Sequence, residues 1–247
     1  EACGDNNIPL IVLDRPIPNW FYVDGPVLDL KYTSFVGMHP VPLVHGLTVG
    51  EFAQMINGEE WLAGKVKCKL EVIPCTGYTH SHTYVLPVKP SPNLPNQLSV
   101  LLYPSLGFFE GTAVSVGRGT DFPFQVFGYP SYPQKQFKFK PAPKKGASVN
   151  PPYKGKTCYG VDLRDFSVDY FIGRKSINLE WLIYTYRTYP NKEKFFNNFF
   201  RNLAGTPLLR KQIEDGLSAE AIRESWQADM DKYKKIRKIY LLYPEFE

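Results

Sequence analysis

The stretch Ile8-Pro9-Leu10-Ile11-Val12-Leu13-Asp14-Arg15-Pro16 decides the fold class of this chain. Its first six residues are almost all apolar, which is typical of a strand buried on both faces of a parallel sheet. We therefore predict an α/β fold. In open α/β sheets, ligands bind just beyond the carboxyl ends of the strands. Asp14 and Arg15 are thus candidate ligand contacts, and a local salt bridge is the alternative for both.

The chain after this strand predicts a long loop and then a helix. The segment from Pro16 to Pro42 is rich in Pro, Gly and aromatic residues with little periodicity, which is typical of an ordered functional loop. Thr48-Val49-Gly50-Glu51 is a capping box and predicts a helix start. His45 precedes that start, where the helix dipole favours a neutral imidazole. His45 could donate a hydrogen bond to a ligand, or be a purely structural histidine.

The remaining pattern predicts further strands and a helical end. Lys67–Ile73 alternates as a half-buried strand, and the proline-rich stretch up to Pro95 suggests a join between two subdomains, residues 1–98 and 99–247. Strands are expected at Ser99–Tyr103, Phe122–Phe127 and Cys158–Leu163, with a surface excursion over 131–156. Helices are expected at Leu179–Arg187, Lys192–Leu203, after Pro207, and from Ser218 onward. The overall pattern is α/β, then strands, then a helical end.

Composition excludes few function classes. Apolar residues make up 43% and charged residues 21%, as in ordinary globular domains. The net charge of +5 is weaker than that of most nucleic-acid-binding domains. Nucleic-acid binding is therefore a weak alternative, because charge is the only feature that supports it. The 15% aromatic content suits a core or a stacking groove. No apolar run approaches the length of a membrane span.

The cysteines and histidines give no strong metal signal. The four cysteines include no CxxC pair, so zinc-ribbon and thioredoxin sites are not supported. Cys68 and Cys75 could pair only if the segment between them turns back, and the redox compartment stays open. Cys75, His80 and His82 could suggest a metal site, but no fourth ligand is evident.

The densest cluster of chemistry-bearing residues is Phe109–Thr120. Glu110 stands beside a glycine, where a ligand can approach the backbone closely. Arg118 lies between two glycines, and a guanidinium matches a carboxylate or phosphate with two parallel hydrogen bonds. The segment lacks the spacing of a P-loop. A salt bridge within the turn explains it as well as a ligand clamp does.

Several short motifs occur in an order that resembles a known family. They are Leu13-Asp14-Arg15-Pro16, Asp24-Gly25-Pro26, Phe35-Val36-Gly37, His45 to Glu51 (HGLTVGE), Ser91-Pro92-Asn93-Leu94-Pro95, Glu110-Gly111-Thr112, Gly117-Arg118-Gly119-Thr120 and the closing Tyr240-Leu241-Leu242-Tyr243. Together they resemble the NamZ family of exo-β-N-acetylmuramidases across essentially the whole chain. Ile17, Ala113 and Val116 depart from the residues most common in that family.

The resemblance implies a glycoside hydrolase that releases N-acetylmuramic acid from the non-reducing ends of peptidoglycan fragments. It implies the end of a Rossmann-like parallel-sheet domain, here lacking its N-terminal part, followed by a smaller α+β C-terminal domain, with the site in the cleft between them. Neither a cofactor nor a metal is implied, and the cell-wall substrate implies a periplasmic or extracellular location. The Gly-Pro-Glu-His-Gly-like motif associated with the family's catalytic glutamate is absent from this chain. The resemblance leaves open whether the chain alone is active.

The resemblance also suggests residue roles. Glycosidases generally need two carboxylates across the scissile bond, and Asp14, Asp24, Glu51 and Glu110 are the candidates here. We expect Glu110 to be the catalytic carboxylate of this chain and Arg118 to pair with the lactyl carboxylate of muramic acid. Further sugar contacts are expected from His45, Asp14, Arg15 and Asn93. The alternative is a non-catalytic module that binds peptidoglycan or sugar.

Overall fold

The opening apolar run forms a parallel strand in the computed structural model, which describes residues 1–245. Strand β1 (Leu10–Leu13) pairs in parallel with β4 (Leu70–Ile73), with Leu10 opposite Leu70. The mixed α/β class and the parallel pairing are confirmed. The expected burial of β1 on both faces was wrong, because Ile11 is 58% and Leu13 74% exposed. In the described residues this sheet has two strands, and helix α2 is the helix that packs against both of them.

The segment expected to be one long loop contains regular structure. Strands β2 (Asp24–Val27) and β3 (Pro42–Val44) pair antiparallel, and a short 3-10 helix, η1 (Leu30–Tyr32), lies between them. The pairing register shifts between Asp24 and Val27. Gly and Pro inside β2 hide the strand from a periodicity test, since both residues are disfavoured within strands.

Helix α2 (Val49–Gly58) begins at the predicted capping box. Thr48 Oγ1 accepts a hydrogen bond from the Glu51 backbone N–H at 3.2 Å, and Glu51 Oε2 accepts one from the Thr48 N–H at 2.8 Å. The short 3-10 helix η2 (Ala63–Lys65) leads from α2 towards β4. The reciprocal cap fixes where the chain leaves the His45–Leu47 turn and enters the helix.

The strand expected at Ser99–Tyr103 is instead part of helix α3 (Gln97–Leu106), which the 3-10 helix η3 (Gly107–Gly111) extends. Asn96 Oδ1 accepts from the Ser99 N–H at 3.0 Å and caps this helix. Val100, Leu101 and Leu102 are consecutive and all buried. A helix buried over most of its surface shows a continuous apolar run, which periodicity alone cannot tell from a buried strand.

The second half contains an antiparallel sheet in the order β5–β7–β6. Its strands are β5 (Val126–Tyr129), β6 (Phe137–Phe139) and β7 (Cys158–Asp162). The strand at β7 is confirmed, β5 lies a few residues later than expected, and β6 falls in the Lys- and Pro-rich segment expected to be a surface excursion. Helices α4 (Val168–Arg174) and α5 (Glu180–Thr188) follow.

The helix expected over Lys192–Leu203 is broken into η4 (Lys192–Lys194) and α6 (Phe200–Ala204). Between them the backbone bonds to the end of η3 and the residues that follow it: the Ala113 N–H donates to Phe195 O at 2.8 Å, and the Asn197 N–H donates to Gly111 O at 2.9 Å. Phe195, Phe196 and Phe200 are buried, as their spacing predicted. The expected α-helix therefore forms only at its end, from Phe200, because tertiary backbone pairing replaces the i to i−4 bonds before it.

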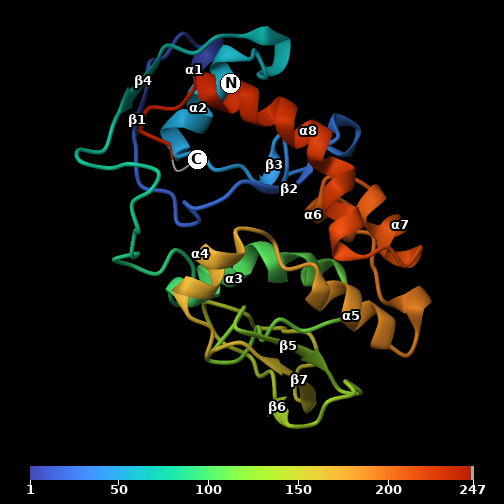
Figure 1. The fold of residues 1–247 in the computed structure, drawn as a ribbon. Helices are drawn as coiled ribbons and strands as arrows, with labels where there is room; N and C mark the ends of the chain where they lie inside the picture. The colour runs from blue at the N-terminus through green and yellow to red at the C-terminus, as the bar shows by residue number, and fades with distance from the viewer. Residues whose placement is uncertain (246–247) are drawn as a thin grey trace.

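The last elements carry the chain back to its first half. After α7 (Leu208–Glu214), the long helix α8 (Ala219–Ile239) crosses towards α1 (Ala2–Asp5), β2 and β3, and both chain ends lie on that side of the molecule (Figure 1). The Tyr233 hydroxyl donates to His45 O at 2.6 Å, and Arg237 Nε donates to Gly46 O at 3.0 Å. One hydrophobic core joins residues of both halves.

No helix within residues 1–245 is both long and apolar enough to cross a bilayer. Cys3, Cys68, Cys75 and Cys158 are all free thiols.

Candidate functional site

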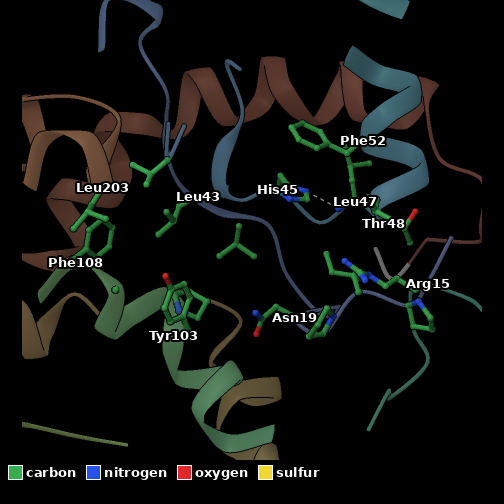
Figure 2. Close-up of a pocket in the computed structure, with 18 residues that line it drawn as sticks. Arg15, Asn19, Leu43, His45, Leu47, Thr48, Phe52, Tyr103, Phe108 and Leu203 are labelled. Carbon is green, nitrogen blue, oxygen red and sulfur yellow. Dashed lines mark hydrogen bonds between the residues drawn. The ribbon is translucent and has the colours of Figure 1, made fainter. Parts of the chain in front are cut away.

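A cavity of about 490 Å³ opens just beyond the carboxyl end of β1, between the first half of the chain and helix α3 (Figure 2). Its volume suits a small ligand such as a sugar. The wall is built from the segment after β1, the turn between β3 and α2, the end of α3, and single residues from two other segments: Arg15, Pro16, Ile17, Pro18, Asn19, Val36, Leu43, Val44, His45, Leu47, Thr48, Val49, Phe52, Tyr103, Pro104, Gly107, Phe108 and Leu203. This cavity is at the position where the sheet rule predicts a ligand.

Among the described residues that line the cavity, Arg15 and His45 are the two with acidic or basic side chains. It is exposed, and no ion pair or hydrogen bond holds its guanidinium within the described chain. Pro16 and Pro18 follow it and restrict the backbone on its far side. The cavity therefore presents a free cation at its mouth.

His45 forms the upper wall of the cavity in Figure 2 and is held as a neutral ring. Its Nδ1 accepts a hydrogen bond from the Leu47 N–H at 3.1 Å, and its ring stacks on Phe52 with centroids 5.0 Å apart. Burial, then the charge of Arg237, lowers the pKa of His45 to about 4. Because Nδ1 is the acceptor, Nε2 carries the proton and is a hydrogen-bond donor.

Gly46 lets the backbone turn sharply behind His45. Its φ is +65°, and a Cβ there would lie 2.6 Å from Val23 Cγ2. Arg237, fully buried on α8, donates to Gly46 O from both Nε and Nη2. The turn that presents His45 is thus fixed by a helix from the far end of the sequence.

Two residues that the sequence did not single out also line the cavity. Asn19 Oδ1 is buried and lacks a hydrogen-bond partner within the described chain. Tyr103 packs its ring on Phe124 at 4.9 Å between centroids, and its pKa is raised by burial and by the nearby Glu110. Asn19 was hidden in the segment expected to be a loop, and Tyr103 in the segment expected to be a strand.

Asp14, expected as a sugar contact, anchors helix α2 instead of lining the cavity. Its carboxylate accepts from Thr48 Oγ1 at 2.7 Å, from the Gly50 N–H at 2.9 Å and from the Tyr243 hydroxyl at 2.6 Å. A carboxylate at a helix N-terminus is favoured by the helix dipole. Asp14 therefore joins β1, α2 and the C-terminal segment.

The other acids considered from the sequence also have partners inside the chain. Glu51 is fully buried and bonds to His80 Nε2 at 2.8 Å and to the Leu242 N–H at 2.9 Å. Asp24 accepts from the Ile177 N–H at 2.8 Å, and burial raises its pKa. Within residues 1–245, no aspartate or glutamate lines the cavity.

Glu110 and Arg118 form a two-pronged ion pair with each other. Arg118 Nε donates to Glu110 Oε1 at 2.6 Å, and Arg118 Nη2 donates to Oε2 at 3.1 Å. The guanidinium also lies over the Phe124 ring at 4.9 Å. Phe124 contacts Tyr103, so the pair lies behind the cavity wall, and neither member lines the cavity. This geometry is the salt bridge that the sequence left open as an alternative to the clamp.

Asn93, expected as a sugar contact, ties the connecting segment to the Lys-rich loop. Its Nδ2 donates to Ala147 O at 3.1 Å, and Asn93 does not line the cavity. In the part of the chain that the structure describes, no group of three or more His, Cys, Asp or Glu side chains could hold a metal ion.

Comparisons with known proteins cover nearly the whole chain. Residues 1–98 match the family model of exo-β-N-acetylmuramidase NamZ, N-terminal, and residues 101–243 match that of the C-terminal part. The chain is 34% identical over 259 residues to peptidoglycan β-N-acetylmuramidase NamZ of Bacillus subtilis (strain 168). That alignment covers 98% of this chain and 61% of the relative, so the chain spans less than two thirds of it.

Two solved structures share the fold. A DUF1343 family protein from Bacteroides fragilis superposes with a TM-score of 0.95 at 48% identity, covering 99% of this chain and 69% of the other. A second DUF1343 family protein from the same organism gives a TM-score of 0.82 at 25% identity, covering 98% of this chain and 68% of the other. With both family models matched along its length, the chain belongs to the NamZ family.

Proposed function

We propose that the protein to which this chain belongs is an exo-acting glycosidase that releases N-acetylmuramic acid from the non-reducing ends of peptidoglycan fragments. Family membership and the name of the B. subtilis relative support this activity. The observation that carries it is the cavity beyond β1, which combines apolar walls with a free cation and a neutral histidine donor. That combination suits a small, amphipathic, negatively charged sugar.

We further propose that residues 1–98 belong to a Rossmann-like domain and residues 99–247 to a smaller C-terminal domain. The parallel pairing of β1 with β4 supports the first part, since parallel strands need a crossover connection and helix α2 lies between these two strands in the chain, as in a βαβ unit. The cavity draws its walls from both segments, which fits a substrate cleft between domains. A peptidoglycan substrate would place the enzyme in the periplasm or outside the cell.

The catalytic carboxylates need a separate proposal. Every acid considered from the sequence is bonded within the chain, and Arg118 holds both carboxylate oxygens of Glu110. The chain spans 61% of its B. subtilis relative. We propose that the full-length protein brings a carboxylate from outside the aligned region to the cavity, and that Glu110 is the first candidate inside this chain.

The test is release of chromophore from 4-nitrophenyl β-N-acetylmuraminide, with the glucosaminide as control. Both this chain and a protein of the full length of the relative are assayed at equal concentration. Activity only at full length supports an essential acid outside this chain. Activity in the chain alone assigns the acid to it, and Glu110→Gln should then abolish turnover. No chromophore release by either protein would contradict the proposed glycosidase activity.

A sugar-binding module is the second candidate, because the acids of this chain are committed to internal bonds. It predicts saturable binding of N-acetylmuramic acid to both proteins with no product from either. Isothermal titration calorimetry beside the chromogenic assay separates the two candidates.

A further inference from the structure

We propose that Arg15 is the residue that selects muramic acid over glucosamine, by binding the carboxylate of the lactyl group, while Asn19 and His45 bind the N-acetyl group and a hydroxyl of the same sugar. This inference deepens the proposed function and rests on it for the identity of the sugar. It moves carboxylate recognition from Arg118, where the sequence motif suggested it, to the mouth of the cavity.

The two sugars differ in one group. N-acetylmuramic acid carries a lactyl ether, which adds one carboxylate and one methyl group to N-acetylglucosamine. A site that selects muramic acid must therefore offer a hydrogen-bonding partner to an anion. If N-acetylglucosamine binds instead, that partner stays unpaired, which increases the selectivity for muramic acid. A guanidinium is well suited because it can give a carboxylate two parallel hydrogen bonds.

Arg15 meets that requirement and Arg118 does not. Arg15 lines the cavity, and no acidic residue of the described chain competes for it. Arg118 already donates to both oxygens of Glu110 and lies outside the cavity wall. For Arg118 to bind a substrate carboxylate, it would first have to give up an ion pair of the same strength.

Asn19 and His45 supply complementary uncharged partners. The buried Asn19 Oδ1 is an acceptor with no partner in residues 1–245, and an acetamido N–H is a donor that would satisfy it. His45 Nε2–H is a donor because Nδ1 accepts from Leu47, so it suits an acetyl oxygen or a hydroxyl. A buried acceptor without a partner costs free energy, and a ligand that fills it recovers that cost.

The apolar wall suits the methyl groups of the lactyl and acetyl substituents. Val36 lines the cavity, as do Leu43 and Phe52, which lie near His45 in Figure 2. Tyr103 lies across the cavity from them and presents a ring on which a sugar face can stack.

The experiment measures binding by this chain, so it does not depend on turnover. Isothermal titration calorimetry compares N-acetylmuramic acid, its lactyl methyl ester and N-acetylglucosamine on wild type, Arg15→Met, Arg15→Lys and Asn19→Ala. Arg210→Met is the matched control, because Arg210 lies on α7 and pairs with Glu214 away from the cavity. Circular dichroism confirms that each variant folds.

Arg15→Met should weaken N-acetylmuramic acid binding by about tenfold to hundredfold, as expected for loss of a charge-assisted hydrogen-bond pair. It should leave the ester and N-acetylglucosamine unchanged, and Arg15→Lys should fall between. Asn19→Ala should weaken all three sugars alike, and Arg210→Met none.

The proposal is overturned if Arg15→Met binds the acid as wild type does, if it loses all three sugars equally, or if the wild-type chain shows no preference for the acid. Failure of the proposed function looks different. If Arg15 governs selective binding but the full-length protein shows no turnover, this inference is supported and the proposed glycosidase activity is contradicted.

Discussion

At the scale of single residues, His45 shows how a side chain can be held in one protonation state. Burial and Arg237 lower its pKa to about 4, and the Leu47 N–H fixes its tautomer. Its donor role therefore persists across the pH range in which most histidines titrate. A pH optimum between 5 and 8 in the full-length protein would have to come from another group.

The lowered pKa of His45 predicts a pH-dependent stability. As the pH falls, His45 in the unfolded chain is protonated near pH 6.5, whereas in the folded chain it is protonated only near pH 4. The contribution of the neutral His45 to the free energy of unfolding is therefore complete above pH 6.5 and is lost as the pH falls towards 4. The loss should reach about 3 kcal/mol at most. Urea unfolding at pH 7.5, 6, 5 and 4.5 should show a shallower decline for His45→Gln than for wild type.

His82→Gln is the control for that series, because His82 is exposed on the surface. Its profile should follow wild type throughout. Parallel profiles for wild type and His45→Gln would show that His45 does not titrate as its surroundings predict.

Arg118 is expected to stabilise the fold and not to read the sugar. Its guanidinium and the Glu110 carboxylate are 27% and 22% exposed as side chains, so the pair is only partly screened by solvent. Arg118→Ala should lower the free energy of unfolding by about 1 kcal/mol. The ratio of affinities for N-acetylmuramic acid and N-acetylglucosamine should stay within about twofold of wild type. A large fall in that ratio would show that Arg118 binds the lactyl carboxylate, as the Gly-Arg-Gly motif suggested.

At the scale of elements, the first turn of α2 is locked against the β1–β4 sheet. The Gly50 N–H donates to Asp14, and a Cβ at Gly50 would lie 2.5 Å from Val72 Cγ1 and 2.9 Å from Asp14 Cγ. The glycine is thus needed for close approach and not for a special backbone angle. The capping box and this contact together set the position of the cavity wall from His45 to Phe52.

Gly50→Ala should therefore destabilise the protein by about 1 to 3 kcal/mol, in the range of overpacked core sites. Gly173→Ala in α4 offers a matched control, because a Cβ there meets nothing within 4 Å. Replacing an open helical glycine by alanine should stabilise by about 0.5 to 1 kcal/mol. Guanidinium unfolding of both variants checks the pair, and equal signs of the two changes would contradict the close-approach argument.

At the scale of the whole molecule, the β1–β4 sheet leaves apolar side chains uncovered in the described chain. Ile8, Ile11 and Leu13 are 54%, 58% and 74% exposed, and Ile73 is 44% exposed. Exposed apolar patches on sheet edges favour association. The core, by contrast, runs without a break from the residues around β2 to helix α8.

We expect this chain to self-associate through that sheet at high concentration. Leu13→Lys should reduce the association measured by light scattering, while changing the free energy of unfolding by no more than about 0.5 kcal/mol, since the side chain is mostly exposed. Met55→Ala, at a fully buried position of α2, should cost about 2 to 5 kcal/mol and serves as the contrast. Unchanged scattering for Leu13→Lys would place any association elsewhere.

Local signals in the sequence determined the helices whose first residues are capped by neighbouring side chains. The predicted caps at Thr48 and Ser218 accept hydrogen bonds from backbone N–H groups three residues later, so neighbours along the chain suffice to start those helices. The same holds for the stripe of α8, because one buried face imposes the helical period on its residues. The order of the short motifs also sufficed for the family.

Only the tertiary structure decided which polar residues face the cavity. The sequence makes both Arg118 and Arg15 candidate ligand contacts, yet in the fold Glu110 pairs with Arg118 and no acidic side chain of the described chain pairs with Arg15. Asn19 and Tyr103 join the site because the segment after β1 and helix α3 meet across it, a contact between residues far apart in the chain. Burial, pairing and the His45 tautomer depend on such long-range contacts, which no local pattern records.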